Sequence, residues 1–130
     1  MELDSGIVSK LAAAAALDKR ATDVVVLDLR ELTIVCDYFV IASARNTIHS
    51  KAVADGIAER LAEEGRRPRH IEGLPTATWV LMDYGDVVVH IFLPEERGYY
   101  DLERLWQEAK VEQIEAVVLD ARQSGGGSRE

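Results

Sequence analysis

Two carboxylates and an imidazole occur close together in one short stretch of this sequence. Asp83 and Asp86 flank Gly85, and His90 follows soon after. Such groups could bind a divalent metal ion or serve as a general acid and base. However, an Asp at a turn commonly accepts a hydrogen bond from its own backbone, and two acids without a third ligand rarely hold a metal. We therefore expect no metal, no cofactor and no catalytic residue here.

Other catalytic patterns are missing from the sequence. It contains neither of the common Gly-rich phosphate-binding loops and no Gly-x-Ser-x-Gly elbow. A nucleotidyltransferase would need a Gly-Ser loop, but Ser43 is not preceded by Gly and is followed by Ala44. It would also need paired strand carboxylates, whereas Asp28 and Asp37 are isolated. Cys36 is the only cysteine, which excludes an internal disulfide, and it is best interpreted as a small hydrophobic residue.

The carboxylates and the imidazole belong to a predicted β-hairpin that spans Trp79–Phe92. Residues 84–86 interrupt two apolar runs where a tight turn needs positive φ, and Pro94 ends the second strand. Side chains alternate along a strand, so the two faces can be separated. One face is apolar and should be buried: Val80, Met82, Tyr84, Val87, Val89 and Ile91. The other is the candidate working surface: Trp79, Leu81, Asp83, Asp86, Val88, His90 and Phe92.

Aromatic side chains could extend this surface into a contact site. Tryptophan and tyrosine are enriched at interface hot spots, because they bury a large area with few torsions. Trp79 lies on the candidate surface, and Tyr99, Tyr100 and Asp101 follow the hairpin. Core packing is the alternative interpretation for both Trp79 and Trp106, and a simple packed pair is the alternative for His90 and Trp79.

The elements that would position this surface follow from hydrophobic spacing and from helix caps. Asp4 or Ser5 can cap a first helix, in which the alanine run 12–16 strongly favours helical structure. The apolar runs 24–27 and 38–43 are short and are typical of buried strands.

The second half of the chain predicts a further helix and more strands. Asn46 or Thr47 can cap a second helix, which Gly65 ends. Residues 69–72 are predicted as a short edge strand, and residues 99–106 as a final helix. Helices that alternate with strands, followed by an antiparallel pair, indicate an α/β domain with a mixed β-sheet flanked by helices.

The domain is predicted to span residues 1–106. Residues 107–122 would form a C-terminal extension of ambiguous structure, because Val111, Ile114, Val117 and Val118 fit a helix while residues 117–119 could begin a strand. Residues 123–130 contain a triple glycine and are predicted to be a disordered tail.

Charge limits the classes of partner. The chain has 15 basic and 23 acidic residues, and its net charge of −8 disfavours direct nucleic-acid binding. The one basic cluster, which comprises Arg66, Arg67, Arg69 and His70, is interpreted as a solvated loop. The acidic excess between Glu95 and Asp120 favours a basic protein partner. No apolar run approaches the roughly 20 residues of a membrane span, and no secretory leader is evident, so we expect a cytoplasmic protein without membrane contact.

The order and spacing of three sequence blocks resemble the Iojap-like family, the ribosomal silencing factors (RsfS). Residues 37–41 are similar to the family's Asp-x-x-(Val/Ile)-Ile strand. Residues 79–90 match its Trp-x-x-x-Asp-x-Gly-Asp-Val-x-Val-His signature, and residues 95–106 match its closing helix. The resemblance runs from about residue 7 to residue 106. The chain departs from the family pattern at Ala44, where Gly is usual, and at Ile48, where arginine is common.

The resemblance implies a nucleotidyltransferase-like α/β fold without the catalytic residues. It also implies a translational repressor that binds the large ribosomal subunit at its protein number fourteen, and that sterically blocks joining of the small subunit when nutrients are scarce. Family members are commonly homodimers. Since ribosomal proteins are typically basic, an acidic chain suits such a target.

These inferences assign roles to residues of the candidate surface. Trp79 would be the apolar anchor, while Asp83 and Asp86 would meet basic side chains of the partner. Secondary contacts would come from Tyr84, His90, Tyr100 and Asp101. Two alternatives remain: a metal-dependent nucleotide-handling enzyme of nucleotidyltransferase-like fold, and a bare dimerisation adaptor whose aromatic face serves only self-association.

Overall fold

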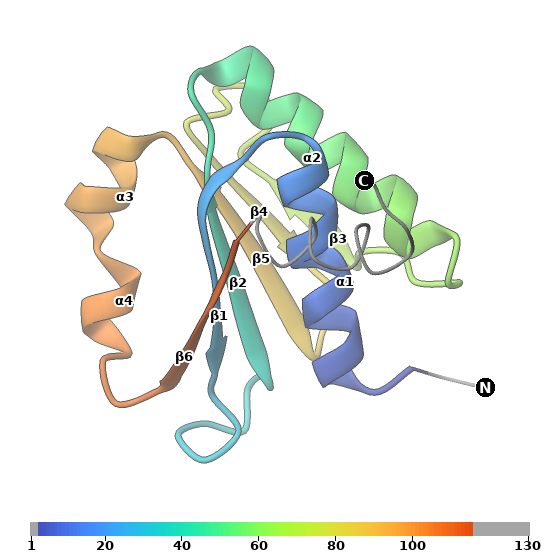
Figure 1. Cartoon of the computed structure of the whole chain (residues 1–130), viewed down its shortest axis with the longest axis vertical. Coiled ribbons are helices and arrows are strands. Elements are labelled where there is room, and N and C mark those ends of the chain that lie inside the picture. The colour runs from blue at the N-terminus through green and yellow to red at the C-terminus, as the bar shows by residue number, and fades with distance from the viewer. Residues whose placement is uncertain (1–2, 116–130) are drawn as a thin grey trace, which may run out of the picture.

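The computed structural model describes residues 3–115 and places helices and strands in alternation (Figure 1). The predicted tail 123–130 lies outside the described residues. The elements are α1 (Ser5–Asp18), β1 (Thr22–Asp28), β2 (Tyr38–Ser43), α2 (Thr47–Ala62), β3 (His70–Glu72), β4 (Trp79–Asp83), β5 (Val87–Phe92), α3 (Pro94–Tyr100), α4 (Leu102–Leu105) and β6 (Lys110–Ile114).

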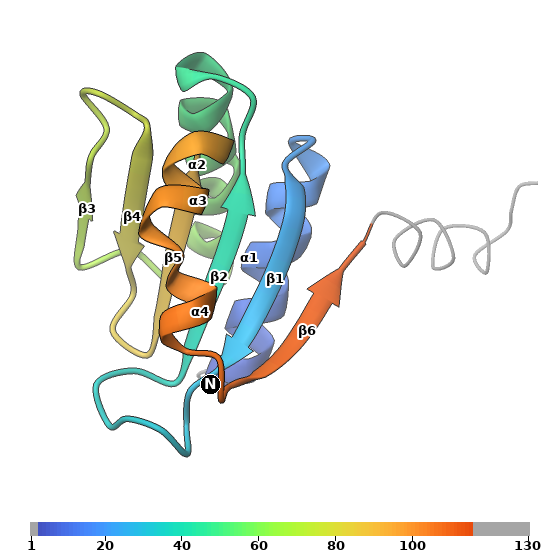
Figure 2. The same cartoon turned by 90° about the vertical axis from the view of Figure 1, so that its left-hand side faces the viewer.

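The strands form one mixed sheet in the order β3-β4-β5-β2-β1-β6. β2 and β5 are parallel, and the other neighbours are antiparallel. Figure 2 shows α3 and α4 in front of the sheet, with α1 and α2 behind it. The α/β class with a mixed sheet between helices is therefore confirmed, as is the edge position of the short strand β3.

Local signals fixed the starts of the two long helices as expected. The Asp4 carboxylate accepts a hydrogen bond from the Ile7 amide at 2.9 Å and caps α1. The Asn46 side chain accepts one from the His49 amide at 2.8 Å and caps α2. Each cap satisfies an amide that has no partner within its helix.

The hairpin of β4 and β5 has the predicted register and the predicted faces. Trp79 pairs with Phe92 and Leu81 pairs with His90, while Gly85 in the turn has a φ of 91°. The predicted apolar face is buried against α1 and α2. It comprises Val80, Met82, Tyr84, Val87, Val89 and Ile91. The opposite face forms a second, smaller core with Leu102 of α4 and with Trp106.

One prediction for the C-terminal part is wrong, and a segment that the sequence left ambiguous has a definite structure. The last helix begins at Pro94 rather than Tyr99, because proline suits the first turn of a helix, and a left-handed Asp101 with a φ of 52° separates α3 from α4. Residues 110–114 form the strand β6, which pairs antiparallel with β1 and so continues the sheet beyond Trp106. The strand start considered at residue 117 lies outside the described residues.

Arg97 fastens α3 and α4 to the sheet. Its guanidinium donates hydrogen bonds to the Asp23 carbonyl at 2.7 Å and to the buried Ser43 hydroxyl at 2.8 Å. It also forms an ion pair with Glu103 at 2.7 Å, and its side chain is only 12% exposed. One side chain thus ties together segments that lie far apart in the sequence.

His90 is a buried polar group in the second core. The residue is 4% exposed, and burial lowers the pKa of its imidazole from 6.5 to about 4. The cause is the desolvation that a charged imidazolium would suffer in this core. His90 is therefore neutral in the folded protein near pH 7.

We expect Arg97→Ala to lower the free energy of unfolding by about 2–3 kcal/mol, because the buried Ser43 hydroxyl and the Asp23 carbonyl lose their donor. Urea unfolding at pH 7 measures the effect. Arg30→Ala is the matched control, since Arg30 binds Asp28 in an exposed ion pair at 2.8 Å and its loss should have a much smaller effect. Equal losses in the two variants would contradict the role of Arg97.

We also expect His90 to make stability fall with pH. Between pH 7 and pH 5 the unfolded chain gains a proton on His90 that the folded state excludes, so the free energy of unfolding decreases by about 2 kcal/mol from this group. In His90→Phe this contribution disappears. Urea unfolding of both proteins at the two pH values isolates it, because all other titrating groups are shared. The same pH dependence in both proteins would contradict the expectation.

Candidate interaction surface

The helices leave part of one sheet face open. Figure 2 shows α3 and α4 over β5 and β2, while β4 and β3 lie beside them without a helix in front. On this face Trp79, Leu81 and Val88 are only half-buried. The open part is therefore formed mainly by the exposed side of the hairpin, which is where the candidate surface was predicted.

Aromatic side chains cross this face in a continuous row. Neighbouring ring centroids lie 4.5–6.0 Å apart, within the range in which aromatic pairs attract one another. We call this set the aromatic row; in spatial order it comprises Tyr99, Tyr100, Trp79, His90, Phe39 and Trp106. Phe92 stacks beneath Trp79 at 4.9 Å and supports the row from the core.

A single hydrogen bond connects the two central members of the row. The indole Nε1–H of Trp79 donates to Nδ1 of His90 at 3.1 Å. Since an indole can only donate, Nδ1 carries no proton, and the neutral ring must hold its proton on Nε2. This Nε2–H has no acceptor among the described residues, although it is fully buried.

An apolar groove of about 330 Å³ lies at the other end of the row. Phe39, Leu81, Val88 and Trp106 line it, together with part of the loop between β1 and β2. In that loop Ile34 and Val35 are 103% and 82% exposed. Sequence reasoning missed this loop. The adjacent β-branched pair between two predicted strands was the available signal. Two larger hollows of about 540 Å³ each border β6, where charged side chains such as Arg97 and Arg30 contribute to their walls.

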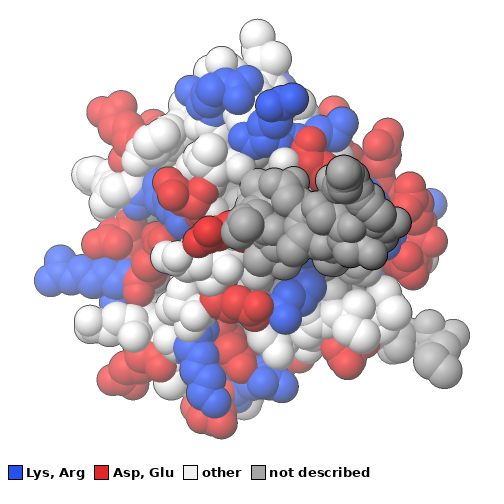
Figure 3. Space-filling view, in the orientation of Figure 1, with Lys and Arg blue, Asp and Glu red and all other residues white. Residues whose placement is uncertain are grey.

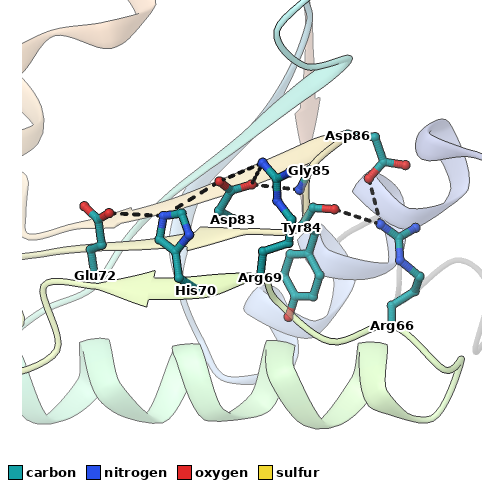
Figure 4. Close-up of polar contacts among 8 residues, drawn as sticks. All are labelled: Arg66, Arg69, His70, Glu72, Asp83, Tyr84, Gly85 and Asp86. Carbon is teal, nitrogen blue, oxygen red and sulfur yellow. Dashed lines mark hydrogen bonds and ion pairs between the residues drawn. The ribbon is translucent and has the colours of Figure 1, made fainter.

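Asp83 and Asp86 are engaged by arginines of their own chain (Figure 4). Arg66 approaches Asp86 at 2.7 Å and also donates to the Tyr84 carbonyl at 3.1 Å. Arg69 approaches Asp83 at 3.3 Å. The basic cluster is therefore not simply a solvated loop, because Arg66 and Arg69 neutralise the two acids that were expected to meet a partner's basic side chains.

Asp83 also stabilises the turn of the hairpin. Its Oδ1 accepts a hydrogen bond from the Gly85 amide at 2.7 Å, which is the backbone contact expected of an Asp at a turn. His70 lies within 3.7 Å of the same carboxylate, and Glu72 follows on β3 (Figure 4). Through these contacts and the ion pairs with Arg66 and Arg69, Asp83 and Asp86 have a structural role at the tip of the hairpin.

Two of the predicted contact residues, Tyr84 and His90, are buried in the fold. Tyr84 is 5% exposed on the face covered by α1 and α2, and burial raises the pKa of its phenol to about 12. His90 is the buried member of the aromatic row, with an exposed fraction of 4%. The sequence pattern places Tyr84 beside the turn and His90 opposite Trp79, but it does not reveal how deeply either side chain is buried.

The remaining predicted residues separate into two groups. Trp79 and Tyr100 lie together, with ring centroids 4.5 Å apart, and Asp101 directly follows Tyr100. Asp83 is at the opposite end of β4, roughly 13 Å along the strand at 3.3 Å per residue. The apolar centre of the site is therefore at the Trp79 end, and the ion pairs are at the turn.

Features associated with other functions were also considered. Over residues 3–115, no group of three His, Cys, Asp or Glu side chains is placed to hold a metal ion. Within the same range, no helix is long and apolar enough to cross a membrane. Cys36 is buried as predicted, and burial raises the pKa of its thiol. Figure 3 shows acidic and basic side chains interspersed on the visible face.

Comparisons with known proteins agree with this architecture. Residues 4–129 match the family model described as "Ribosomal silencing factor during starvation". The chain is 42% identical over 108 residues to the ribosomal silencing factor RsfS of Bacillus subtilis, covering 83% of this chain and 92% of that protein. It is 37% identical over 100 residues to the chloroplastic protein Iojap of Zea mays, covering 75% of this chain and 42% of that protein.

Solved structures show the same similarity. A crystal structure of a Chromobacterium violaceum protein superposes with a TM-score of 0.79 at 37% identity, covering 81% of this chain and 88% of that one. A Bacillus halodurans crystal structure gives a TM-score of 0.72 at 35% identity, covering 85% and 99%. Sequence and fold therefore agree, and the chain belongs to the ribosomal silencing factor (RsfS) family.

Proposed function

We propose that this chain represses translation by binding the large ribosomal subunit in the cytoplasm, at its protein number fourteen, and by sterically blocking the small subunit. Membership of the ribosomal silencing factor family supports a ribosomal target. The observation that carries the proposal is the open aromatic end of the sheet face, where Trp79 is half-buried and Tyr100 is 48% exposed. Such a surface is typical of an anchor for a protein partner.

Charge agrees with a protein target of basic character. The chain carries a net charge of −8, which favours encounter with basic proteins and disfavours phosphate backbones. Because Asp83 and Asp86 are paired with arginines, the apolar contacts of Trp79, Tyr99 and Tyr100 supply the affinity in this proposal. Overall charge then serves to steer the encounter.

We further propose that the chain forms a homodimer through the groove end of the same face. Ile34 protrudes next to the groove, so an apolar projection and an apolar hollow lie side by side on one surface. A two-fold axis would place each Ile34 in the groove of the other copy, as an isologous interface requires. The ribosome would then bind the Trp79 end.

We expect Trp79→Ala to weaken co-sedimentation with purified large ribosomal subunits by roughly 2 kcal/mol, or about thirtyfold in dissociation constant, because an aromatic anchor is lost. Tyr100→Ala, which truncates the more exposed neighbouring ring, should weaken binding in the same direction. Sucrose-gradient sedimentation with separated subunits measures binding of both variants. Both variants should also block the joining of the two subunits less than wild type does.

Val111→Ala is the control for these variants, since it truncates an exposed side chain on β6 at the far edge of the sheet. It should bind like wild type. Wild-type protein that remains at the top of the gradient over a range of salt would overturn the proposal. Magnesium-dependent nucleotide binding that Asp83→Asn abolishes would instead support the nucleotide-handling enzyme.

We expect Ile34→Asp to convert a dimer into a monomer, because a carboxylate would be buried in the apolar groove of the partner copy. Size-exclusion chromatography with light scattering should give twice the chain mass of 14.4 kDa for wild type and the single mass for the variant. Ile48→Asp is the matched control, since Ile48 is an equally apolar exposed residue on α2. A monomeric wild type, or equal effects of both substitutions, would contradict this interface.

A further inference from the structure

The hydrogen bond between Trp79 and His90 has no evident purpose in core packing. His90 lies between apolar neighbours: the Phe39 ring is 4.5 Å away, and the Phe92 ring is nearly parallel at 6.1 Å. A phenylalanine would fit such surroundings without polar atoms. The imidazole instead leaves its Nε2–H buried with no acceptor among the described residues, which destabilises the folded state.

Among the described residues, the other imidazole nitrogen has one hydrogen-bond partner. Nδ1 accepts the indole N–H of Trp79 at 3.1 Å. The indole has no other polar atom, so this bond selects one orientation of the ring. In that orientation the indole lies between the Phe92 ring at 4.9 Å and the Tyr100 ring at 4.5 Å. His90 therefore controls the geometry of the exposed aromatic end from inside the core.

We propose that His90 is a positioning residue, which presets the indole of Trp79 for docking and does not itself contact the partner. The inference rests on the proposed function and deepens it. A preset indole loses less rotational freedom on binding. Without the acceptor, only a fraction of the molecules presents the indole in the docking orientation, and the apparent affinity falls by that fraction.

Two substitutions at His90 separate positioning from packing. His90→Phe keeps a ring of similar size but removes the acceptor. His90→Asn restores an acceptor near the position of Nδ1 while losing ring volume. We expect His90→Phe to bind large ribosomal subunits about fivefold more weakly than wild type, which corresponds to the roughly 1 kcal/mol of one hydrogen bond. His90→Asn should recover part of that loss.

Two further readouts do not depend on the ribosome. In ¹⁵N NMR spectra, the His90 nitrogens should show the proton on Nε2, and the Trp79 indole N–H should exchange faster with solvent in His90→Phe than in wild type. In urea at pH 7, His90→Phe should unfold no more readily than wild type, because removal of the buried Nε2–H without an acceptor offsets the loss of the acceptor for the indole N–H of half-buried Trp79. A merely structural role for His90 predicts the opposite: lower stability and an unchanged indole.

The outcomes distinguish this inference from the proposed function. Suppose that Trp79→Ala binds weakly while His90→Phe binds as tightly as wild type. The positioning role is then overturned and the proposed function stands. A proton on Nδ1, or unchanged indole exchange in His90→Phe, overturns the positioning role as well. If wild type itself fails to sediment with large subunits, the proposed function is overturned, and the docking role of His90 with it.

Discussion

The helices cover the two faces of the sheet unequally, and this difference determines where apolar side chains remain accessible to a partner. The long helices α1 and α2 cover one face, which holds the larger core. Within residues 3–115, the helices on the other face are the short α3 and α4, which Pro94 starts and a left-handed Asp101 divides. Arg97 ties this short pair to β1 and β2 through hydrogen bonds to the Asp23 carbonyl and the Ser43 hydroxyl. Within the described residues, these two short helices therefore do not extend over β4, and they leave the strand that carries Trp79 uncovered on this face (Figure 2).

An uncovered half-face requires a stable hairpin, and the charged residues of this region meet that need. Arg66 and Arg69 hold the two ends of the turn through Asp86 and Asp83. Such partly exposed pairs contribute little to overall stability, but they order the tip against β3 and the loop after α2. Asp83 and Asp86 therefore serve to hold the shape of the turn. The aromatic row is left as the candidate surface for binding a partner.

Short-range patterns predicted much of this fold, and long-range pairings explain what they missed. The alternation in residues 79–92 specified both hairpin faces, because a strand has a fixed period of two residues. The strand β6 could not be recognised in the same way, since it forms by pairing with β1 much earlier in the chain: Val24 pairs with Ile114, 90 residues later. The pairing of Arg66 with Asp86 likewise joins residues 20 apart. The alternation also did not reveal how deeply a side chain is buried. It assigned His90 to the correct face of the hairpin, but it could not show that the imidazole is buried there.

The placement of His90 shows how stability and recognition can compete at one position. A buried donor without an acceptor is a cost that folding alone would remove, and natural sequences keep such costs mainly where function requires them. Here the same ring that carries the unpaired Nε2–H also orients Trp79. In the proposed function, the core therefore sets the orientation of the Trp79 anchor in advance, and the surface needs little reorganisation when it binds its partner.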